Sequence, residues 1–375
     1  MLIRGKPCVV FDIEVFTNIF HVTAYNTETK DLVKYEVSER KNNIRDVIRF
    51  FSVRDCYFVG YNNLHYDNPI INYCIEFFNN ELFSVHEICT SIYNLSRVIT
   101  DKEDKSIERW KRWKYANNFE TLDLLTMLYS QALRVSLKEM QVTMHYKNVQ
   151  EFVVDWSVAL AIDKFDDMIA YNINDVMSTN ELLERSAKDI ALRISIEDEY
   201  HIRCLSKDGV GIGTELLKQR YLAKTGQTWD QIKNLRSPMD FIALRDVILP
   251  KISYSTQILQ SLLERLKMAT VSPGRKGLEE QFIFGGLKIS VGVGGIHSKN
   301  TPEIITPAKD EVLLDCDAAS LYPSLLISYG FYPKHLGHEF VDIYTDVRTE
   351  RLQAKHSKQK NKDTTLKLLL NSVTG

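Results

Sequence analysis

The sequence has few of the features that would set it apart from an ordinary globular protein. Its 375 residues include only six cysteines, and no two of them form a CxxC pair, so neither a disulfide framework nor a zinc site is expected. No uncharged apolar run reaches the ~18 residues that a transmembrane helix needs. The N-terminus also lacks the apolar core and cleavage site of a signal peptide. We therefore expect a cytoplasmic protein whose six cysteines are reduced core residues.

The net charge is small as well. Forty-seven lysines and arginines against forty-nine acids leave a charge of −2, which excludes a basic nucleic-acid coat protein. A local basic stretch nevertheless lies between Thr345 and Lys367. This stretch predicts either a site for an anionic ligand or a solvated helix face, and composition alone favours neither. Its basic residues are Arg348, Arg351, Lys355, Lys358, Lys360, Lys362 and Lys367.

The sequence does contain clear periodic patterns. Residues 8–16 alternate between apolar and polar side chains, which is typical of a strand. Further strands are predicted at 19–25, 32–37 and 56–60, and a helical pattern begins at residue 44 and recurs over 122–129 and 165–187. Strands interleaved with helices in this order predict an α/β domain over residues 1–190.

The pattern of predicted helices and strands changes after residue 190. Residues 191–280 are predicted to form a mainly helical connecting region. Residues 281–375 contain glycine-rich strands and the basic stretch. At ~150 residues per domain, 375 residues suit two or three such regions. The individual elements predicted here are helices at 189–206, 213–223, 240–250 and 254–268, and a strand at 312–317 that runs into residues 321–328.

Two acids lie on the polar face of the first predicted strand. Asp12 and Glu14 are two residues apart, so they point the same way and lie about 7 Å apart along the chain. Adjacent carboxylates repel each other, and a sheet tolerates them where water or cations neutralise them. Oxygen ligands of this kind suit Mg²⁺ or Mn²⁺. The alternative is a strand face exposed to solvent.

Two later segments carry acids suited to the same site. Asn63 and Asp67 follow a predicted strand, where α/β proteins commonly build their sites. Tyr171 and Asp175 are four residues apart and share a helix face, from which the tyrosine can position a water molecule. Asp123 is a rival acid, whose alternative role is to cap the start of a helix.

Taken in order, the segments Phe11–Glu14, Asn63–Asp67 and Tyr171–Asp175 resemble the three motifs of the DEDD-type 3′→5′ exonucleases, in the subclass that uses tyrosine. The resemblance implies an RNase H-like fold in which four carboxylates hold two divalent ions. It also implies that Tyr171 orients the attacking water and that Asn63 helps to hold the 3′-terminal nucleotide. Val15 stands where this family often has threonine. The implied metal ligands are Asp12, Glu14, Asp67 and Asp175.

A further segment, Asp317–Ser324, follows the last predicted strand. A carboxylate, backbone amides and a tyrosine ring in one small volume suit a metal-bound triphosphate. A strand-to-helix corner with proline at the helix start would give the same pattern. The eight residues resemble motif A of family B DNA polymerases. By this resemblance Asp317 binds a catalytic metal, and Tyr322 stacks on the deoxyribose and excludes a 2′-hydroxyl.

Other segments resemble further motifs of the polymerase family. Residues 367–375 resemble motif B, with Thr374 in place of the usual tyrosine, and residues 292–298 resemble the Y-x-G-G loop, with Gly292 in place of its tyrosine. The pair at 351 and 355 matches the fingers pattern that grips the triphosphate. The resemblance implies nucleotide contacts from Tyr322, Arg351, Lys355, Lys367 and Asn371, and DNA contacts from Gly294, Gly295, Ser372 and Gly375.

The resemblance covers the whole chain and implies the N-terminal portion of a phage-type family B DNA polymerase with a proofreading exonuclease. Its substrates would be primer–template DNA, single-stranded 3′ ends and dNTPs, with two Mg²⁺ or Mn²⁺ ions in each active site, in the host cytoplasm. The second palm acid of the family follows motif B and is not among these residues. We therefore expect a second polypeptide to complete the palm and thumb, from a gene that is split, interrupted or truncated. The alternatives are a stand-alone exonuclease and a non-catalytic DNA-binding subunit.

Overall fold

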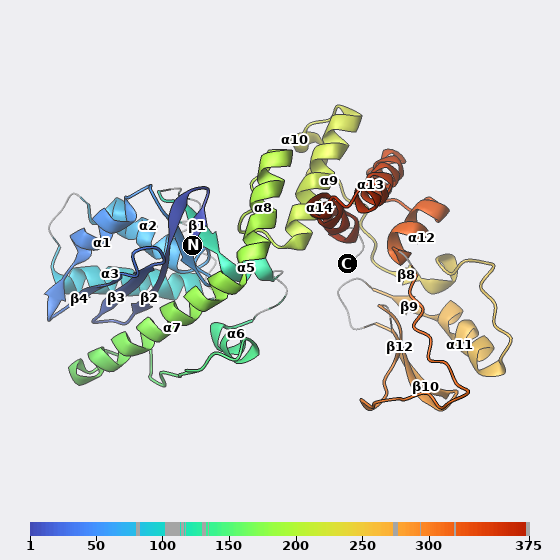
Figure 1. The fold of residues 1–375 in the computed structure, drawn as a ribbon, viewed down its shortest axis with the longest axis horizontal. Helices are drawn as coiled ribbons and strands as arrows, with labels where there is room; N and C mark the ends of the chain where they lie inside the picture. Colours follow the sequence, from blue (N-terminus) through green and yellow to red (C-terminus); the bar gives the residue numbers. More distant parts are fainter. Residues whose placement is uncertain are drawn as a thin grey trace. The chain divides into compact units, whose positions relative to one another are not determined.

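The computed structural model describes residues 1–79, 83–101, 113, 116, 118–129, 133, 135–272, 277–292, 294–318 and 320–372. The chain divides into two compact units (Figure 1), one made of Met1–Tyr221 with Ile343–Gly375 and the other of Leu222–Asp342. Within the described ranges, no helix combines the length and apolar character that a membrane span requires. The domain limits predicted near 190 and 280 stay predictions.

The first unit is built on a mixed β-sheet, as the α/β prediction requires. The strand order is β5-β4-β3-β2-β6-β7, with β1 paired to β2. The strands β2, β3 and β4 are antiparallel neighbours, whereas β6 and β7 run parallel to β2. Their bounds are β1 (Leu2–Ile3), β2 (Lys6–Val15), β3 (Phe20–Asn26), β4 (Leu32–Ser38), β5 (Lys41–Asn42), β6 (Tyr57–Gly60) and β7 (Thr121–Asp123).

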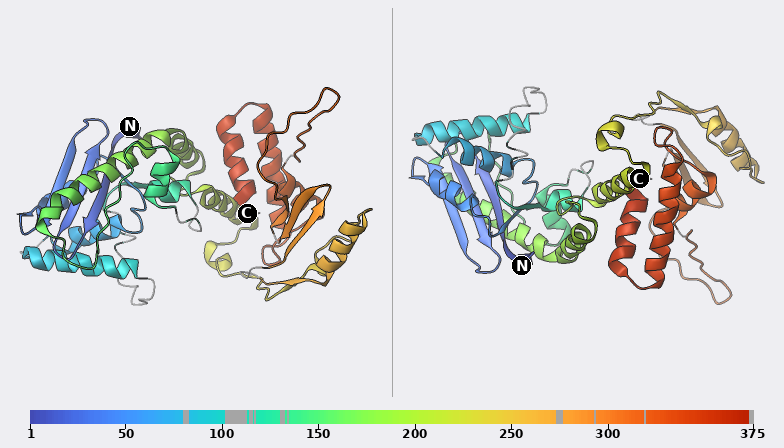
Figure 2. Two further views of the ribbon diagram at one scale, coloured as in Figure 1. Left: turned by 90° about the horizontal axis from the view of Figure 1, so that it is seen from below. Right: turned by 90° about the horizontal axis from the view of Figure 1, so that it is seen from above.

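Helices cover both faces of this sheet (Figure 2). One face carries Phe11 and Ile13 of β2, which pack in a core with α1 (Ile44–Phe51), α2 (Asp67–Phe77) and α3 (Val85–Thr100). The other face carries Val10, which packs in a second core with Val176 of α7 (Phe165–Arg185). The two-residue period of the sequence therefore sorts the side chains of β2 between two helical layers, and Asp12 and Glu14 fall on the side of α7.

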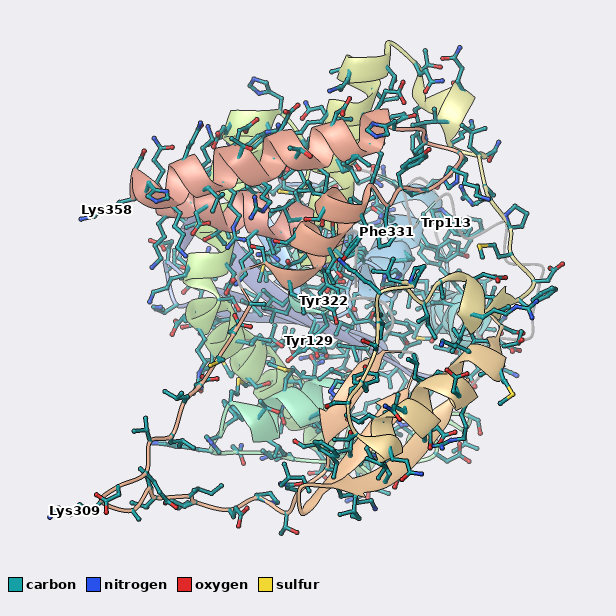
Figure 3. The ribbon with its side chains drawn as sticks, turned by 90° about the vertical axis from the view of Figure 1, so that its right-hand side faces the viewer. Trp113, Tyr129, Lys309, Tyr322, Phe331 and Lys358 are labelled. Carbon is teal, nitrogen blue, oxygen red and sulfur yellow. The ribbon has the colours of Figure 1, made fainter. Side chains whose placement is uncertain are left out.

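The first unit also contains helices that contact one another, among them α9, α13 and α14. Arg220 donates to both carboxylate oxygens of Glu350, at 2.7 and 2.9 Å, and so ties α9 to α13. The hydroxyl of Tyr344 donates to the carbonyl of Leu370 and joins α13 to α14. Lys358 lies at the tip of this helical hairpin (Figure 3). The elements are α5 (Leu124–Leu128), α6 (Leu137–Thr143), η1 (Ile162–Lys164), α8 (Ala187–Tyr200), α9 (Gly209–Thr225), α13 (Glu339–His356) and α14 (Lys360–Ser372).

The second unit contains two small sheets and a few helices. The strands β10, β11 and β12 form a three-stranded antiparallel sheet, which confirms the predicted glycine-rich strands. A two-stranded sheet joins β8 to β9. The bounds are α10 (Trp229–Ile232), β8 (Ile242–Ala243), η2 (Leu244–Asp246), α11 (Gln257–Met268), β9 (Thr270–Val271), β10 (Glu279–Phe284), β11 (Leu287–Gly292), β12 (Gly295–Ser298) and α12 (Leu321–Tyr329).

Several local predictions are wrong. The segment 312–317 is exposed and forms no strand, because it pairs with no strand among the described residues. Residues 240–250 form β8 and η2 rather than a helix, since Ile242 pairs with Val271. Leu122 belongs to strand β7, and the helix predicted there begins only at Leu124. Cys316 is exposed, whereas the other five cysteines are buried as expected.

Candidate functional site

Three of the four predicted metal ligands meet at the end of strand β2. The parallel strand β6 pairs with β2 only at Cys8–Val10, so the last residues of β2 extend beyond it. On that side the backbone N–H of Ile13 donates to Oδ1 of Asp67 at 3.3 Å. Asp67 is the first residue of α2. Its carboxylate is therefore held against the peptide that lies between Asp12 and Glu14.

The connection that presents Asp67 is fixed by close contacts. A Cβ on Gly60 would lie 2.7 Å from the Cβ of Asn63, so the tight approach requires glycine. The Asn63 side chain is fully buried and donates to Oδ1 of Asn68 at 3.1 Å and to Oγ1 of Thr121 at 2.9 Å. Asn63 thus stabilises the connection, and the contact to a 3′-terminal nucleotide stays a prediction.

Asp123 takes its alternative role and caps a helix. Its Oδ1 accepts the backbone N–H groups of Leu125 and Thr126 at the start of α5, at 2.9 and 3.2 Å. The same carboxylate accepts the N–H groups of Asn62 and Leu64, both at 3.0 Å. Burial raises the pKa of Asp123 to about 6, against the opposing effect of these four donors. Asp123 therefore fixes the β6–α2 connection and leaves the metal-ligand set to the other acids.

Helix α7 brings an amide to the two acids of β2. Nδ2 of Asn172 lies 2.6 Å from Oδ2 of Asp12 and 3.5 Å from Oε1 of Glu14. The amide nitrogen donates to both carboxylates and holds their side chains toward the helix. Asn172 is fully buried, and its Oδ1 has no hydrogen-bond partner within the described structure.

The fourth acid, Asp175, lies one turn further along α7 and is 6% exposed. Its Oδ1 forms an ion pair with Lys138 of helix α6 and accepts a hydrogen bond from Nε2 of Gln141 at 3.0 Å. Nε2 of Gln141 also donates to Oγ of Ser178 at 2.8 Å. A lysine and an amide from α6 therefore hold the carboxylate that the sequence assigned to the metal site.

The electrostatics show that the four acids share one small volume. Burial raises the pKa of Asp12 well above its ordinary value, and the charges of Asp67, Glu14 and Asp175 raise it further. Burial and the charge of Asp175 raise the pKa of Glu14 to about 8. Burial raises the pKa of Asp67 to about 7. Such a cluster binds protons near neutral pH unless a cation offsets its charge, and Lys138 supplies only one positive charge.

Tyr171 lies at the edge of this cluster. Nζ of Lys138 lies 4.4 Å from the centroid of the Tyr171 ring. The centroids of the Tyr171 and Phe152 rings are 5.7 Å apart. Burial and the negative charges of Asp175 and Glu14 raise the pKa of the phenol. Tyr171 therefore keeps its proton at physiological pH and is available as a hydrogen-bond donor.

The oxygen donors of this site suit a divalent ion. Three buried carboxylates and a fourth beside them are hard oxygen ligands of the type that Mg²⁺ and Mn²⁺ bind. Their raised pKa values show that the folded chain alone does not balance their charge. Within the described ranges, however, no three His, Cys, Asp or Glu side chains are arranged as a metal centre. The chemistry of these ligands fits a divalent ion. In this structure Asn172 donates to a carboxylate oxygen of Asp12, and Lys138 forms an ion pair with Asp175.

The residues predicted for a polymerase site are divided between the two units. In the second unit, Asp317 is exposed in a segment without regular structure. Tyr322 is 57% exposed near the start of α12. Gly294 is exposed, and Gly295 has a φ of +141°, which favours glycine. The side chains of Asp317 and Tyr322 are both open to solvent.

The other predicted polymerase residues lie on the α13–α14 hairpin of the first unit. Nε of Arg351 donates to Oδ1 of Asp363 at 3.0 Å. Lys355 and Lys367 are exposed on α13 and α14 respectively. Asn371 and Ser372 lie in the last turn of α14, and Ser372 donates to the Leu369 carbonyl at 2.7 Å. Gly375 lies outside the described residues.

Three residues of the carboxylate site were missed by the sequence analysis. Asn172 lies inside the Tyr171–Asp175 segment, where a polar residue at a buried helix position was an available signal. Lys138 and Gln141 are three residues apart in a short helix, and only the capping pair of Ser136 and Glu139 marks its start. Their pairing with Asp175 is a long-range contact that local patterns do not reveal.

Comparisons with known protein families, with curated proteins and with solved structures find no match to this chain.

We expect the metal-free protein to lose stability as the pH rises from 6.5 to 8. In the folded state the pKa of Glu14 is about 8, whereas the ordinary value is 4.5. The folded state therefore binds more protons than the unfolded state in this window, so the free energy of unfolding falls as the pH rises. Glu14 alone contributes a fall of about 2 kcal/mol over these 1.5 pH units. Urea unfolding in EDTA at the two pH values measures the difference.

The control for this pH dependence is Glu14→Gln, which removes one titrating group and is expected to make the profile less steep, with the remaining slope due to Asp12 and Asp67. His21 does not interfere, because burial lowers its pKa from 6.5 to about 4. Because the pKa of His21 is lower in the folded state than in the unfolded state, its titration reduces the free energy of unfolding only as the pH falls below 6.5. Equal stability of the wild type at pH 6.5 and 8 would contradict the raised pKa of Glu14.

Proposed function

We propose that this chain is a 3′→5′ exonuclease that removes nucleotides from single-stranded DNA ends, using two Mg²⁺ or Mn²⁺ ions on an RNase H-like fold in the cytoplasm. The observation that supports this most strongly is the gathering of Asp12, Glu14, Asp67 and Asp175 around one end of β2. Buried like charges destabilise a fold, so such a cluster is a strong candidate for a functional site.

Each residue of the site has a defined part in this proposal. Asp12, Glu14, Asp67 and Asp175 would hold the ions, which when bound supply charge stabilisation to the phosphodiester. The amide of Asn172 keeps the carboxylates of β2 turned toward α7. The protonated phenol of Tyr171 would orient the attacking water. The ammonium group of Lys138 adds positive charge beside the position of the anionic substrate.

A cavity of about 610 Å³ supports a substrate with an aromatic base. Its walls include the rings of Tyr61, His65 and Tyr129, together with Leu137. His65 is two residues before Asp67, and Leu137 directly precedes Lys138. Two of the residues that line the cavity are therefore close in the sequence to residues of the carboxylate site. Aromatic side chains in such a position are suited to stack on a nucleobase.

The proposal is tested with a single-stranded oligonucleotide carrying a label at either end. With Mg²⁺, a 3′ label is expected to leave as a mononucleotide at once, and a 5′-labelled strand is expected to shorten as a ladder. EDTA is expected to stop both reactions, and an oligonucleotide with an inverted 3′-terminal nucleotide is the matched substrate control. Release of label from the 5′ end first, or no hydrolysis at all, would overturn the proposal.

Tyr171→Phe is expected to lower the hydrolysis rate by about 10- to 100-fold, because it removes only the hydroxyl that orients the water. The ring contacts with Lys138 and Phe152 remain, so the affinity for single-stranded DNA is expected to stay the same. Single-turnover rates and a binding titration in EDTA measure the two quantities. A variant that loses affinity and keeps its rate would contradict the role of the hydroxyl.

We also propose that the chain forms part of a family B DNA polymerase, with a second polypeptide as its partner. The supporting observation is that Lys355 and Lys367 are exposed on neighbouring helices of the α13–α14 hairpin, where their charges can reach a triphosphate. Tyr322 is likewise exposed, as a sugar-contacting residue requires. Photo-crosslinking of a dNTP to the full chain, with the modified peptide mapped, tests this assignment. Labelling outside these segments would count against it.

A further inference from the structure

A second cavity lies on a different flank of α7 from Tyr171 and Asp175. It has a volume of about 480 Å³ and is bounded by the N-terminal half of α7 and by residues of β3, β4 and β5. The α7 residues that line it are spaced at intervals of three and four, as one helix face requires. They include Asp166, Ile169 and Ile173. The cavity is therefore separate from the side of α7 that carries the exonuclease residues.

The charged side chains around this cavity do not cancel. Arg40 donates to Glu36 at 2.8 and 3.0 Å and to Asp166 at 3.0 Å, so one guanidinium group orders both acids. Lys34 and Lys41 also line the cavity and are exposed, and neither has an ion-pair partner among the described residues. Arg40 and the two acids together carry a charge of −1, and the two unpaired ammonium groups add +2, which leaves one net positive charge.

The wall of the cavity also contains a buried imidazole with an unused nitrogen. His21 is fully buried, and its Nε2 lies 3.0 Å from Oγ1 of Thr23. Its Nδ1 has no hydrogen-bond partner within the described structure. Buried polar atoms of this kind usually have a partner, which is a protein group, a water molecule or a ligand. The wall of this cavity therefore contains a buried polar atom whose hydrogen-bonding capacity the described residues leave unused.

We propose that this cavity binds a small phosphomonoester and that a mononucleotide is the ligand that fits it. The two unpaired ammonium groups, Lys34 and Lys41, suit a phosphate group. Ile169 and Ile173 provide an apolar wall for the body of the ligand. The volume of about 480 Å³ lies in the range of small-molecule sites. This proposal does not depend on the exonuclease activity.

The test is calorimetric titration of the full chain with dAMP in EDTA, so that no divalent ion links the nucleotide to the carboxylate site. We expect dAMP to bind at one site and deoxyadenosine, which lacks the phosphate, to show no binding. We also expect inorganic phosphate to compete with dAMP but to bind at least tenfold more weakly. Absence of dAMP binding, or equal binding of the nucleoside, would overturn the proposal. Equal affinity for inorganic phosphate would overturn the assignment of a mononucleotide.

Variants locate the site. The double variant Lys34→Ala, Lys41→Ala is expected to weaken dAMP binding at least tenfold, and because both side chains are exposed its thermal melting is expected to match the wild type. Lys188→Ala, an exposed lysine on α8, is the matched control and is expected to bind normally. Asp12→Asn is also expected to bind dAMP normally. Normal binding by the double variant, or loss of binding by Asp12→Asn, would show that the nucleotide lies elsewhere.

Discussion

Asp12→Ala is expected to abolish the Mg²⁺-dependent release of nucleotides from 3′ ends, with a loss of about 1000-fold or more. Such a loss corresponds to about 4 kcal/mol of transition-state stabilisation. The reason is that Asp12 lies between the other acids of the cluster, whose charges all raise its pKa. Without it, the remaining carboxylates would hold divalent ions poorly, and two-metal hydrolysis depends on both ions. Single-turnover hydrolysis of a labelled oligonucleotide measures the effect.

The fold is expected to survive this substitution. Asp12 repels its acidic neighbours, so its removal relieves repulsion between like charges, and this gain offsets the loss of the hydrogen bond from Asn172. In EDTA the thermal melting temperature of Asp12→Ala is therefore expected to equal or exceed that of the wild type. Asp31→Ala, which changes an exposed acid near the start of β4, is the matched control and is expected to keep full activity. More than a tenth of wild-type activity in Asp12→Ala would exclude the proposed site.

Asp123→Ala is expected to destabilise the protein by about 3–4 kcal/mol, the largest effect on stability that we expect from a single substitution. The carboxylate accepts four backbone N–H groups, from Asn62, Leu64, Leu125 and Thr126. Its loss leaves these donors without their acceptor in a fully buried place. Urea unfolding monitored by circular dichroism measures the change in the free energy of unfolding.

Asp123→Asn is the matched control. Its remaining oxygen can accept the three N–H groups that Oδ1 accepts now, so only the contact at 3.0 Å to Leu64 is lost. We expect it to cost about 1–2 kcal/mol, clearly less than the loss in the alanine variant. If the alanine variant unfolds within 1 kcal/mol of the wild type, the cap does not hold the connection as described.

The sequence alone predicted the parts of the fold that repeat with a short period. The alternation around Asp12 predicted β2, its two faces and the side on which the acids lie, and the spacing of Tyr171 and Asp175 predicted their helix. Each of these features depends on neighbours two to four residues away, which a local pattern contains. The α/β class followed from the order of the elements.

The features that escaped prediction depend on distant partners. Lys138 pairs with Asp175, which is 37 residues away in the sequence. No local sequence pattern around either residue predicts this contact. The segment 312–317 has the apolar composition of a strand, yet a strand also needs a neighbour to bond its backbone groups, and none pairs with it among the described residues. Asn63 has the right position in its motif, but its hydrogen bonds to Asn68 and Thr121 could be seen only in the folded chain.

The overhang of β2 beyond β6 limits where this chain can be redesigned. Asp67 is anchored to the amide of Ile13, and the connection before it is fixed by Gly60 and by the carboxylate of Asp123. A single inserted residue between Gly60 and Asp67 would therefore pull the acid away from the strand. An insertion within β2 would turn Asp12 toward the opposite helical layer. Residues inserted to accommodate a new substrate should therefore be placed in neither segment. Insertions are better tolerated in segments whose two ends are not both held by such contacts.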